Sequence, residues 1–333
     1  MPNSITPFIS ILIPVRNEAA YIKQCLDAVL AQDFPQHRME ILIADGMSED
    51  ETRQIIQGFQ ADHPHIQLID NPSKIVPTGL NRLIQQATGD ILIRVDGHCV
   101  IAPDYVRNCV ELLQTTDADN VGGCMVAVGN DKISNVIVAA TSTPFGVGGA
   151  RFHYSEKEEW VDTVYLGAWR REVFANIGLF DEELVRDQDD EFNYRLRKFG
   201  GKIFLSPKIK STYRPRGSFK KLWHQYFQYG FYKVRVLQKH PKQMRPRQFI
   251  PPVFVACLLL LLLLSLTFPW GWIPLVGFVG IYLLANLGAS LLTARVAGWH
   301  TLPLLPLAFA TLHISYGAGF LAGLAKFWNR WKT

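Results

Sequence analysis

No aspartate or glutamate follows Glu191 in this chain of 333 residues. Up to that residue, 14 lysine and arginine residues stand against 29 acidic residues, a net charge of −15, and the remaining 20 basic residues give the rest a net charge of +20. The overall charge of +5 therefore hides an acidic part and a basic part. The basic part continues into Phe249–Phe268, with its seven consecutive leucines, which favours anionic lipid over nucleic acid as its partner.

Cysteine is scarce as well. The five cysteines are an odd number without paired metal-type spacing, which predicts a reduced, cytosolic compartment. No basic leader with an apolar run and a cleavage site begins the sequence, so we expect no secretion signal. The glycine-rich dinucleotide fingerprint is missing after the first strand-like segment, Ile9–Val15, which argues against a nicotinamide-binding domain.

Short apolar strands alternate with amphipathic helices over the first hundred or so residues. Asn17 is the predicted N-cap of the first helix. This alternation predicts an α/β fold, with a doubly wound, mostly parallel sheet covered by helices on both faces. The predicted strands are Ile9–Val15, Glu40–Ala44, Ile66–Ile69 and Ile91–Val95.

Acidic side chains follow these strands, where ligands bind in open α/β sheets. Asp96 and His98 offer a carboxylate and an imidazole that can ligate one divalent cation, and such a cation can hold a diphosphate. The alternative for this pair is a turn with a surface histidine. Asp45 can accept a hydrogen bond from a nucleobase or a ribose hydroxyl, the alternative being a turn acid or helix cap. For Asp50, capping is at least as good an explanation.

Three motifs in order resemble those of family 2 glycosyltransferases with the GT-A fold: Ser10–Glu18 (SILIPVRNE), Ala44–Thr52 (ADGMSEDET) and Val95–His98 (VDGH). The most similar variety is the membrane-anchored bacterial type of exopolysaccharide assembly, as in succinoglycan biosynthesis. The resemblance covers about the first 240 residues. It implies an inverting transfer of a sugar from a nucleotide-diphosphate donor, most commonly a UDP-sugar, to a lipid-linked acceptor, with Mg²⁺ or Mn²⁺ as cofactor.

The resemblance also implies site residues. Asp96 and His98 would form the aspartate-x-histidine variant of the metal motif, and Asp96 would also face the nucleotide. The segments that line the nucleotide pocket in the family correspond here to Pro14, Val15, Arg16, Glu18, Asp45 and Asn81.

Two positions depart from the family pattern. The positions of the family's usual pair of aspartates are occupied by Ala44 and Asp45 here, so Asp45 alone would contact the nucleobase. Leu80 stands where an arginine often precedes the helix asparagine, and Lys74 is the candidate replacement for its phosphate contact. A solvated loop lysine is the alternative at Lys74.

The middle of the chain is expected to hold the acceptor. Val121–Val128 and Val161–Tyr165 are predicted strands, and Thr143–Gly149 is a predicted flexible loop. Trp169 is predicted to stack on a sugar ring, and Arg170 or Arg171 to neutralise a lipid-linked phosphate. The alternative places both arginines at exposed positions in the first turn of a helix.

A cluster of acids begins the next predicted helix. The family's glutamate-aspartate pair corresponds to Gln188-Asp189, so the resemblance implies Asp189 as the general base. Asp190 is the adjacent competitor, since consecutive helical residues point in different directions. The alternative is that these acids complement the positive end of the helix dipole. Phe192, Leu196 and Phe199 are predicted to share one face of this helix.

The basic part of the chain predicts a membrane region. Ser218–Gln238 mixes aromatic and basic residues, as in helices at the bilayer interface. Each of three later segments is near the length that crosses a bilayer. The basic run before them places the catalytic domain in the cytoplasm, at the inner membrane. The apolar segments are Phe249–Phe268, Trp270–Leu292 and Leu302–Ala325.

The number of spans stays open. Three spans would place Lys326, Arg330 and Lys332 outside, against the positive-inside tendency. One segment could instead be a shallow hairpin or an interfacial helix. The predicted domains are a catalytic domain at residues 1–215, an interfacial region at 216–247 and a membrane domain at 248–333.

Two other functions were weighed against the transferase. A nucleotidyltransferase would need a phosphate-cradling glycine-rich loop with a lysine near the first strand, and none is found. A membrane scaffold that binds nucleotide-sugar without turnover is disfavoured by Asp96, His98 and Asp189. Gln228–Tyr232 lacks the glutamine-x-x-arginine-tryptophan motif of processive relatives, which favours the addition of one sugar per encounter.

Overall fold

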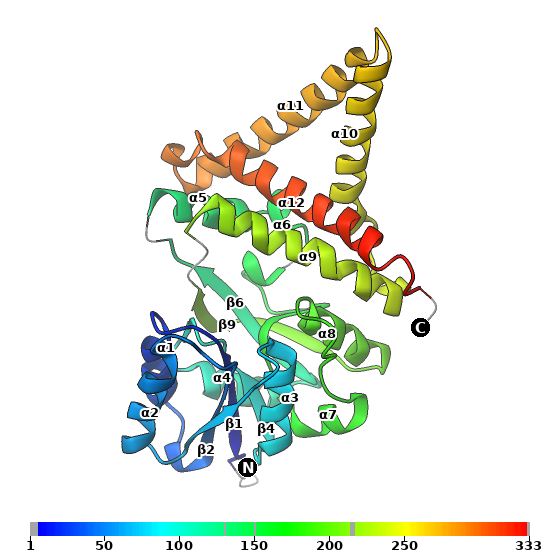
Figure 1. The fold of residues 1–333 in the computed structure, drawn as a ribbon. Helices are drawn as coiled ribbons and strands as arrows, with labels where there is room; N and C mark the ends of the chain where they lie inside the picture. The colour runs from blue at the N-terminus through cyan, green and yellow to red at the C-terminus, as the bar shows by residue number, and fades with distance from the viewer. Residues whose placement is uncertain (1–5, 130, 150, 214–216, 332–333) are drawn as a thin grey trace. The chain divides into compact units, whose positions relative to one another are not determined.

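The structure is a computed structural model that describes residues 6–129, 131–149, 151–213 and 217–331 (Figure 1). The described residues divide into two compact units. The first contains residues 6–127 and 151–213, and the second contains 128–149 and 217–331. Residues 128–149, which the sequence assigned to the catalytic domain, thus group with the C-terminal helices. The division into three domains stays a prediction.

A mixed β-sheet organises the first unit. Its strand order is β3-β2-β1-β4-β8-β6-β9-β5, and β7 pairs with β9. The first four strands in chain order are parallel, whereas β8 runs antiparallel to β4 and to β6. The strands are β1 Ile9–Val15, β2 Met39–Asp45, β3 Ile66–Asp70, β4 Ile91–Arg94, β5 Cys99–Ile101, β6 Asn120–Ala127, β7 Glu159–Trp160, β8 Tyr165–Arg170 and β9 Ile203–Tyr213.

Helices cover both faces of this sheet, as predicted. Alternate side chains of a strand point to opposite faces, so Ile11 and Ile13 of β1 belong to one core cluster and Leu12 to the other. The first cluster packs under α1 Ile22–Leu30, α2 Thr52–Asp62 and α4 Tyr105–Thr115. The second packs under α3 Val76–Gln86, α7 Arg171–Ile177 and α8 Gln188–Lys198.

Several local predictions were wrong. Asn17 does not cap α1, since it has a positive φ of 55° and its side chain accepts a hydrogen bond from Glu49 N instead. Phe199 is 69% exposed, because α8 ends at Lys198 before that residue can face the core. The predicted strand at 161–165 begins only at Tyr165 and continues to Arg170.

The second unit is helical. The predicted flexible loop at 143–149 contains the short helix α6, which begins with Pro144 at a position that favours helix initiation. Three of the helices, α10, α11 and α12, are long and apolar enough to cross a membrane. The helices are α5 Lys132–Thr141, α6 Pro144–Val147, α9 Phe219–Lys239, α10 Ile250–Thr267, α11 Trp272–Ala297 and α12 Leu305–Lys326.

Candidate active site

The segments after four parallel strands meet at one edge of the sheet. The register pairs Val15 of β1 with Asp45 of β2, and Asp45 with Asp70 of β3. β4 pairs with β1 so that Arg94 lies beside Leu12, two residues before Asp96. The carboxyl ends therefore gather the predicted acids, as expected from the parallel arrangement.

Asp96 is held by a residue that the sequence analysis did not single out. Arg94 Nε donates to Asp96 Oδ1 at 2.8 Å, and Arg94 Nη2 donates to Asp96 Oδ2 at 3.2 Å. Both side chains are largely buried. Burial alone would raise the pKa of Asp96, but the positive charges of Arg94, His98 and Arg186 lower it below its usual value. Asp96 is therefore a carboxylate at neutral pH.

His98 lies against the loop that follows β1. Its Nδ1 is 3.1 Å from Glu18 Oε1, and its ring forms an edge contact with Tyr213, with ring centroids 5.6 Å apart. His98 also borders a cavity of about 470 Å³ whose lining includes Tyr21 and Thr212. The structure thus pairs His98 with Glu18, and His98 borders the open space that a ligand site requires.

The donor atoms here fit a divalent cation in part. Among the described residues, no three histidine, cysteine or acidic side chains form a preformed metal cluster. Asp96 and His98 supply two donors, and a carboxylate with an imidazole suits Mn²⁺ as well as Mg²⁺. Such ions commonly complete their coordination with substrate phosphates and water. The pair therefore fits an ion that arrives with a diphosphate.

Asp189 lies in the first turn of α8. Burial alone would lower the pKa of Arg94, but the charges of Asp96 and Asp189 raise it above its usual value, so both acids act on the same guanidinium. Glu191, the third acid of this turn, is buried and paired with Arg195 at 2.7 Å. Glu191 is thereby committed to α8 itself, which leaves Asp189 and Asp190 as candidates for the base.

Two cations flank the edge of the site. Arg16 Nη2 is 3.7 Å from Glu49 Oε1, and Lys74 Nζ is 3.9 Å from the same oxygen. Both basic side chains are more than 40% exposed. Contacts this long and exposed hold the side chains weakly, so both cations can turn towards an anionic ligand.

Asp45 is more enclosed than the sequence analysis expected. Its side chain is fully buried and accepts hydrogen bonds from Ser48 Oγ at 2.5 Å and from Arg53 Nη1 at 3.0 Å. Arg53 also pairs with Asp70 at 2.7 Å. Asp45 therefore ties the loop after β2 to α2, and its contact with a nucleobase stays a prediction.

Three other residues predicted for the nucleotide pocket, Pro14, Val15 and Asn81, are buried in the first unit. Pro14 and Val15 are buried within β1, beneath the loops. Asn81 is buried, and both of its polar atoms are used: Nδ2 donates to Phe180 O and Oδ1 accepts from Phe180 N, each at 2.9 Å. Asn81 thus joins α3 to the loop before α8, and its contact with the nucleotide stays a prediction.

Trp169 lies in the core, so the predicted stacking on a sugar ring is wrong. Only 2% of this residue is exposed, and its ring packs edge-on against Phe174, Phe180 and Phe192, with centroids 5.7 to 6.1 Å apart. β8 is an interior strand of the sheet, and Trp169 points to the face covered by α7 and α8.

Arg170 and Arg171 lie at the opposite edge of the sheet from Asp96. β8 runs antiparallel to β4, which pairs Arg170 with Ile91 at the start of β4. Both guanidinium groups donate to backbone carbonyls, Arg170 to Leu113 and Arg171 to Gly89. The direction of the strand therefore contradicts the predicted phosphate contact. The alternative is right about the helix, since Arg171 begins α7 and Arg170 is its N-cap residue, but both arginines are only partly exposed.

The sequence analysis missed Arg94 and Tyr165. Tyr165, at the start of β8, places its hydroxyl 2.8 Å from Cys99 Sγ, and its ring contacts Tyr213. The only available signal for Arg94 was a charged residue inside an apolar strand. For Tyr165 there was no signal, because its place at this edge depends on the antiparallel course of β8.

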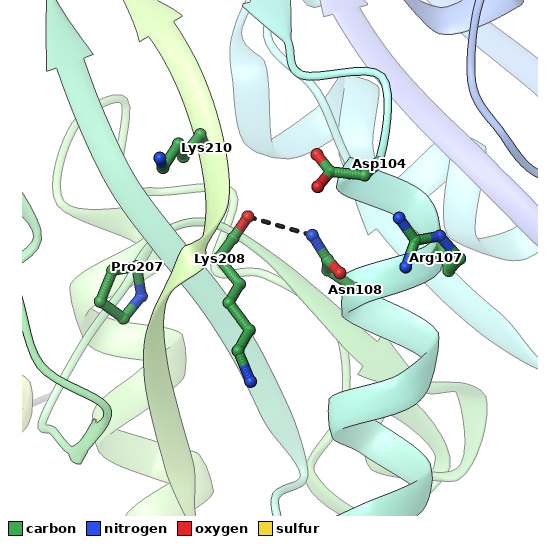
Figure 2. Close-up of a pocket in the computed structure, with 6 residues that line it drawn as sticks. All are labelled: Asp104, Arg107, Asn108, Pro207, Lys208 and Lys210. Carbon is green, nitrogen blue, oxygen red and sulfur yellow. Dashed lines mark hydrogen bonds between the residues drawn. The ribbon is translucent and has the colours of Figure 1, made fainter.

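A second cavity, of about 540 Å³, lies between α4 and β9 (Figure 2). Asn108 Nδ2 donates to Lys208 O across it at 3.1 Å. Two of its cations are paired at the surface, Arg107 with Asp33 and Lys208 with Glu158. None of the residues predicted for the active site lines this cavity.

Comparison with known proteins agrees with this geometry. The family model described as glycosyl transferase family 2 matches residues 10–178. The succinoglycan biosynthesis protein ExoA of Rhizobium meliloti (strain 1021) is 30% identical over 322 residues, 96% of each chain. The sheet with its acidic edge and these matches together define a glycosyltransferase. The chain belongs to glycosyltransferase family 2.

A further relative and two solved structures extend the comparison. The dolichyl N-acetyl-alpha-D-glucosaminyl phosphate 3-beta-D-2,3-diacetamido-2,3-dideoxy-beta-D-glucuronosyltransferase of Methanococcus voltae is 32% identical over 240 residues, 70% of this chain and 74% of that protein. The mannosyltransferase PcManGT from Pyrobaculum calidifontis, solved with GDP-Man and Mn²⁺, has a TM-score of 0.60 at 17% identity, covering 97% of this chain and 88% of its own. S. aureus TarS 1-349 with UDP-GlcNAc has a TM-score of 0.53 at 16% identity, covering 96% and 92%. These likenesses confirm the predicted GT-A fold.

Proposed function

We propose that this glycosyltransferase moves a sugar from a nucleoside-diphosphate donor, UDP in the first instance, to a lipid-linked acceptor in the assembly of a surface polysaccharide or glycan. The proposal is carried by one observation: Asp96, His98 and Glu18 gather at the carboxyl ends of the parallel strands, and Asp189 acts on the same guanidinium as Asp96. The exopolysaccharide role of ExoA and the dolichyl phosphate in the name of the archaeal relative support the acceptor class.

The reaction needs a base on the acceptor side and charge neutralisation on the donor side. The acceptor hydroxyl oxygen attacks the anomeric carbon, the bond from that carbon to the diphosphate oxygen breaks, and Asp189 takes the hydroxyl proton. A single displacement of this kind inverts the anomeric configuration. Arg16 and Lys74 lie at the edge of the site, where they can contact the departing diphosphate.

Asp96 and His98 would hold the divalent cation. When bound, the cation supplies positive charge to the leaving diphosphate. Arg94 holds Asp96 with two hydrogen bonds and so fixes its direction. Mn²⁺ in the PcManGT complex supports a divalent cation in general.

We also place the enzyme in the inner membrane as a multi-pass protein, with its catalytic unit in the cytoplasm. The basic residues between Lys239 and Arg247 immediately precede α10. Positive residues collect on the cytoplasmic side of spanning helices. A cytoplasmic site has direct access to nucleotide sugars.

The test is release of nucleoside diphosphate by the full-length protein in detergent, measured with a panel of nucleotide sugars, a lipid extract as acceptor, and with or without Mn²⁺. One donor should give metal-dependent turnover. Asp189→Asn should lower kcat at least 10²-fold, the usual range for loss of an essential acid-base group. Asp96→Asn should abolish the metal-dependent turnover, because it removes a proposed ligand of the cation.

Matched variants separate the possible outcomes. Asp117→Asn removes an exposed acid whose partner is Lys202 and should keep wild-type turnover. If Asp190→Asn is inactive while Asp189→Asn is active, the base is Asp190. Binding of a donor without turnover, in a preparation with competent acceptor, would overturn the transferase and favour the scaffold.

A further inference from the structure

α12 differs from the other two apolar helices in its surroundings. Half of its most apolar 18-residue window is buried within the second unit, against 11% in each of α10 and α11. α9 lies beside it (Figure 1). Contacts follow the same order along both helices: Leu222 shares an apolar cluster with Phe309, and farther along Phe231 contacts Phe327, with ring centroids 4.9 Å apart. The two helices therefore run parallel over most of their length.

Glycines bring the two backbones into direct contact. A Cβ on Gly319 of α12 would lie 2.0 Å from Phe227 O of α9, and a Cβ on Gly230 of α9 would lie 2.0 Å from Tyr316 O of α12. One helical turn after Gly319, a Cβ on Gly323 would lie 2.5 Å from Phe231 O. No lipid chain or water layer fits between backbones this close, so wherever α12 lies, α9 lies with it.

α9 is too charged for the hydrocarbon region. Near its end, Arg235 places its guanidinium 5.7 Å from the ring of Phe327, and Gln238 Nε2 donates to Phe327 O at 2.7 Å. Charged side chains are strongly disfavoured in the hydrocarbon region of a bilayer. The basic residues of α9 are Lys220, Lys221, Lys233, Arg235 and Lys239.

α10 and α11 have the opposite character. They contact the rest of the unit through their ends: the buried residues of α10 lie near its start, Pro252 and Val255, and those of α11 lie between Asn286 and Ala294. Beyond these contacts the apolar side chains are open, with Leu266 78% and Trp270 73% exposed. In Figure 1 both helices rise from α12 and meet at the turn between them.

We propose that the chain crosses the membrane twice, with α10 and α11 as a helical hairpin, while α9 and α12 lie together in the interface on the side of the basic segment. Aromatic rings and cations such as those of α9 are favoured at headgroup depth. Lys326 and Arg330, at the end of α12, then lie on the same side as Arg247. Three spans would place them on opposite sides, against the positive-inside tendency.

Cysteine labelling of the full-length protein in intact bacterial cells tests this arrangement. Trp270→Cys places a thiol in the exposed turn between α10 and α11, and Trp331→Cys places one beyond α12. A membrane-impermeant maleimide should label the first in intact cells and the second only after the cells are opened. The unsubstituted chain, with its five native cysteines, gives the background.

A green fluorescent protein fused to the C-terminus supplies a second readout, since it fluoresces only when it stays in the cytoplasm, and we expect fluorescence. Labelling of Trp331→Cys in intact cells, or a dark fusion that is present in the membrane, would overturn the proposal in favour of three spans. Protection of Trp270→Cys in intact cells would also overturn it, because the hairpin would then not cross. None of these readouts needs turnover, so they stand or fall separately from the transferase proposal.

Discussion

Arg94 is the main site residue that the structure identifies and the sequence analysis did not. It is a charged residue on a buried strand, it binds both oxygens of Asp96, and the charge of Asp189 acts on it as well. Its Nη1 is buried and has no hydrogen-bond partner among the described residues. Arg94 therefore acts through Asp96, as a positioning residue for the proposed cation ligand.

Substitution of Arg94 should separate cation affinity from turnover. Arg94→Met removes the nearest positive charge from Asp96, so a divalent cation should bind at lower concentration, while kcat falls because the carboxylate is no longer oriented. Removal of one partner of a buried pair costs about 3–5 kcal/mol of stability. Mn²⁺ titration of turnover, together with thermal unfolding, checks both effects.

Arg94→Lys is the matched control. It keeps the charge but can make only one of the two hydrogen bonds, so it should recover most of the stability and only part of kcat. An Mn²⁺ requirement that is identical in wild type, Arg94→Met and Arg94→Lys would contradict the positioning role.

The lowered pKa of His153 should make the stability of the fold depend on pH. Burial lowers the pKa of His153 to about 4 in the folded chain, whereas an unfolded histidine titrates near its usual value of about 6.5. The unfolded state thus binds more protons between these values, and stability falls as the pH falls from about 6.5 towards 4.

His153→Gln removes this titration. The melting temperature of the wild type should drop more between pH 7 and pH 5 than that of His153→Gln, as measured by thermal unfolding in the same detergent. Equal drops in the two proteins would mean that other groups determine the acid sensitivity.

At the scale of elements, the contact between α9 and α12 depends on small residues. Gly319→Ala would place a methyl group 2.0 Å from Phe227 O, so the helices must separate. Overpacking of this kind typically costs about 1–3 kcal/mol. We expect a lower melting temperature in detergent, with Gly288→Ala on α11 as the control because its Cβ would meet nothing within 4 Å. Equal melting temperatures for the two variants would argue against a tight pair.

The direction of one element decided which predicted site residues failed. Trp169, Arg170 and Arg171 follow Tyr165 closely in the sequence, and these three were predicted to contact the acceptor. Because β8 runs antiparallel to β4, only its first residues reach the edge that carries Asp96, and its last residues lie at the other edge. A motif gives the order of residues along a strand but not the direction in which the strand enters the sheet.

At the scale of the whole molecule, the uneven charge predicts a lipid requirement. The chain after Glu191 carries 20 basic residues and no acid, next to the apolar helices. Each lysine or arginine near an anionic surface contributes about 1 kcal/mol, within the screening length of the salt. Turnover in nanodiscs should therefore be higher with anionic than with zwitterionic lipid.

Measuring the same lipid preference at two salt concentrations provides the control. Raising the ionic strength from 0.05 to 0.5 M should reduce the advantage of anionic lipid, since the Debye length shortens from about 14 Å to about 4 Å. A lipid preference that does not respond to salt would indicate a specific headgroup site instead of a charged surface.

The sequence by itself determined the features that depend on neighbours along the chain. Alternating apolar strands and amphipathic helices predicted a doubly wound α/β sheet, and the resemblance of three motifs to family 2 glycosyltransferases implied the GT-A fold. The acids at or just after the ends of β1, β2 and β4 predicted the edge at which the candidate site lies, because parallel strands all end there. Composition alone identified the apolar helices, since the length and hydropathy that cross a bilayer are properties of a single segment.

Only the tertiary structure decided what depends on contacts between distant segments. It paired Arg94 with Asp96 in the interior, buried Trp169 and Asn81, and enclosed Asp45 behind Ser48 and Arg53. It also set α12 against the charged helix α9, a contact that no property of α12 alone reveals. Burial and hydrogen-bond partners are set by how elements pack, so residues with the same local pattern become a ligand, a core side chain or an interfacial surface.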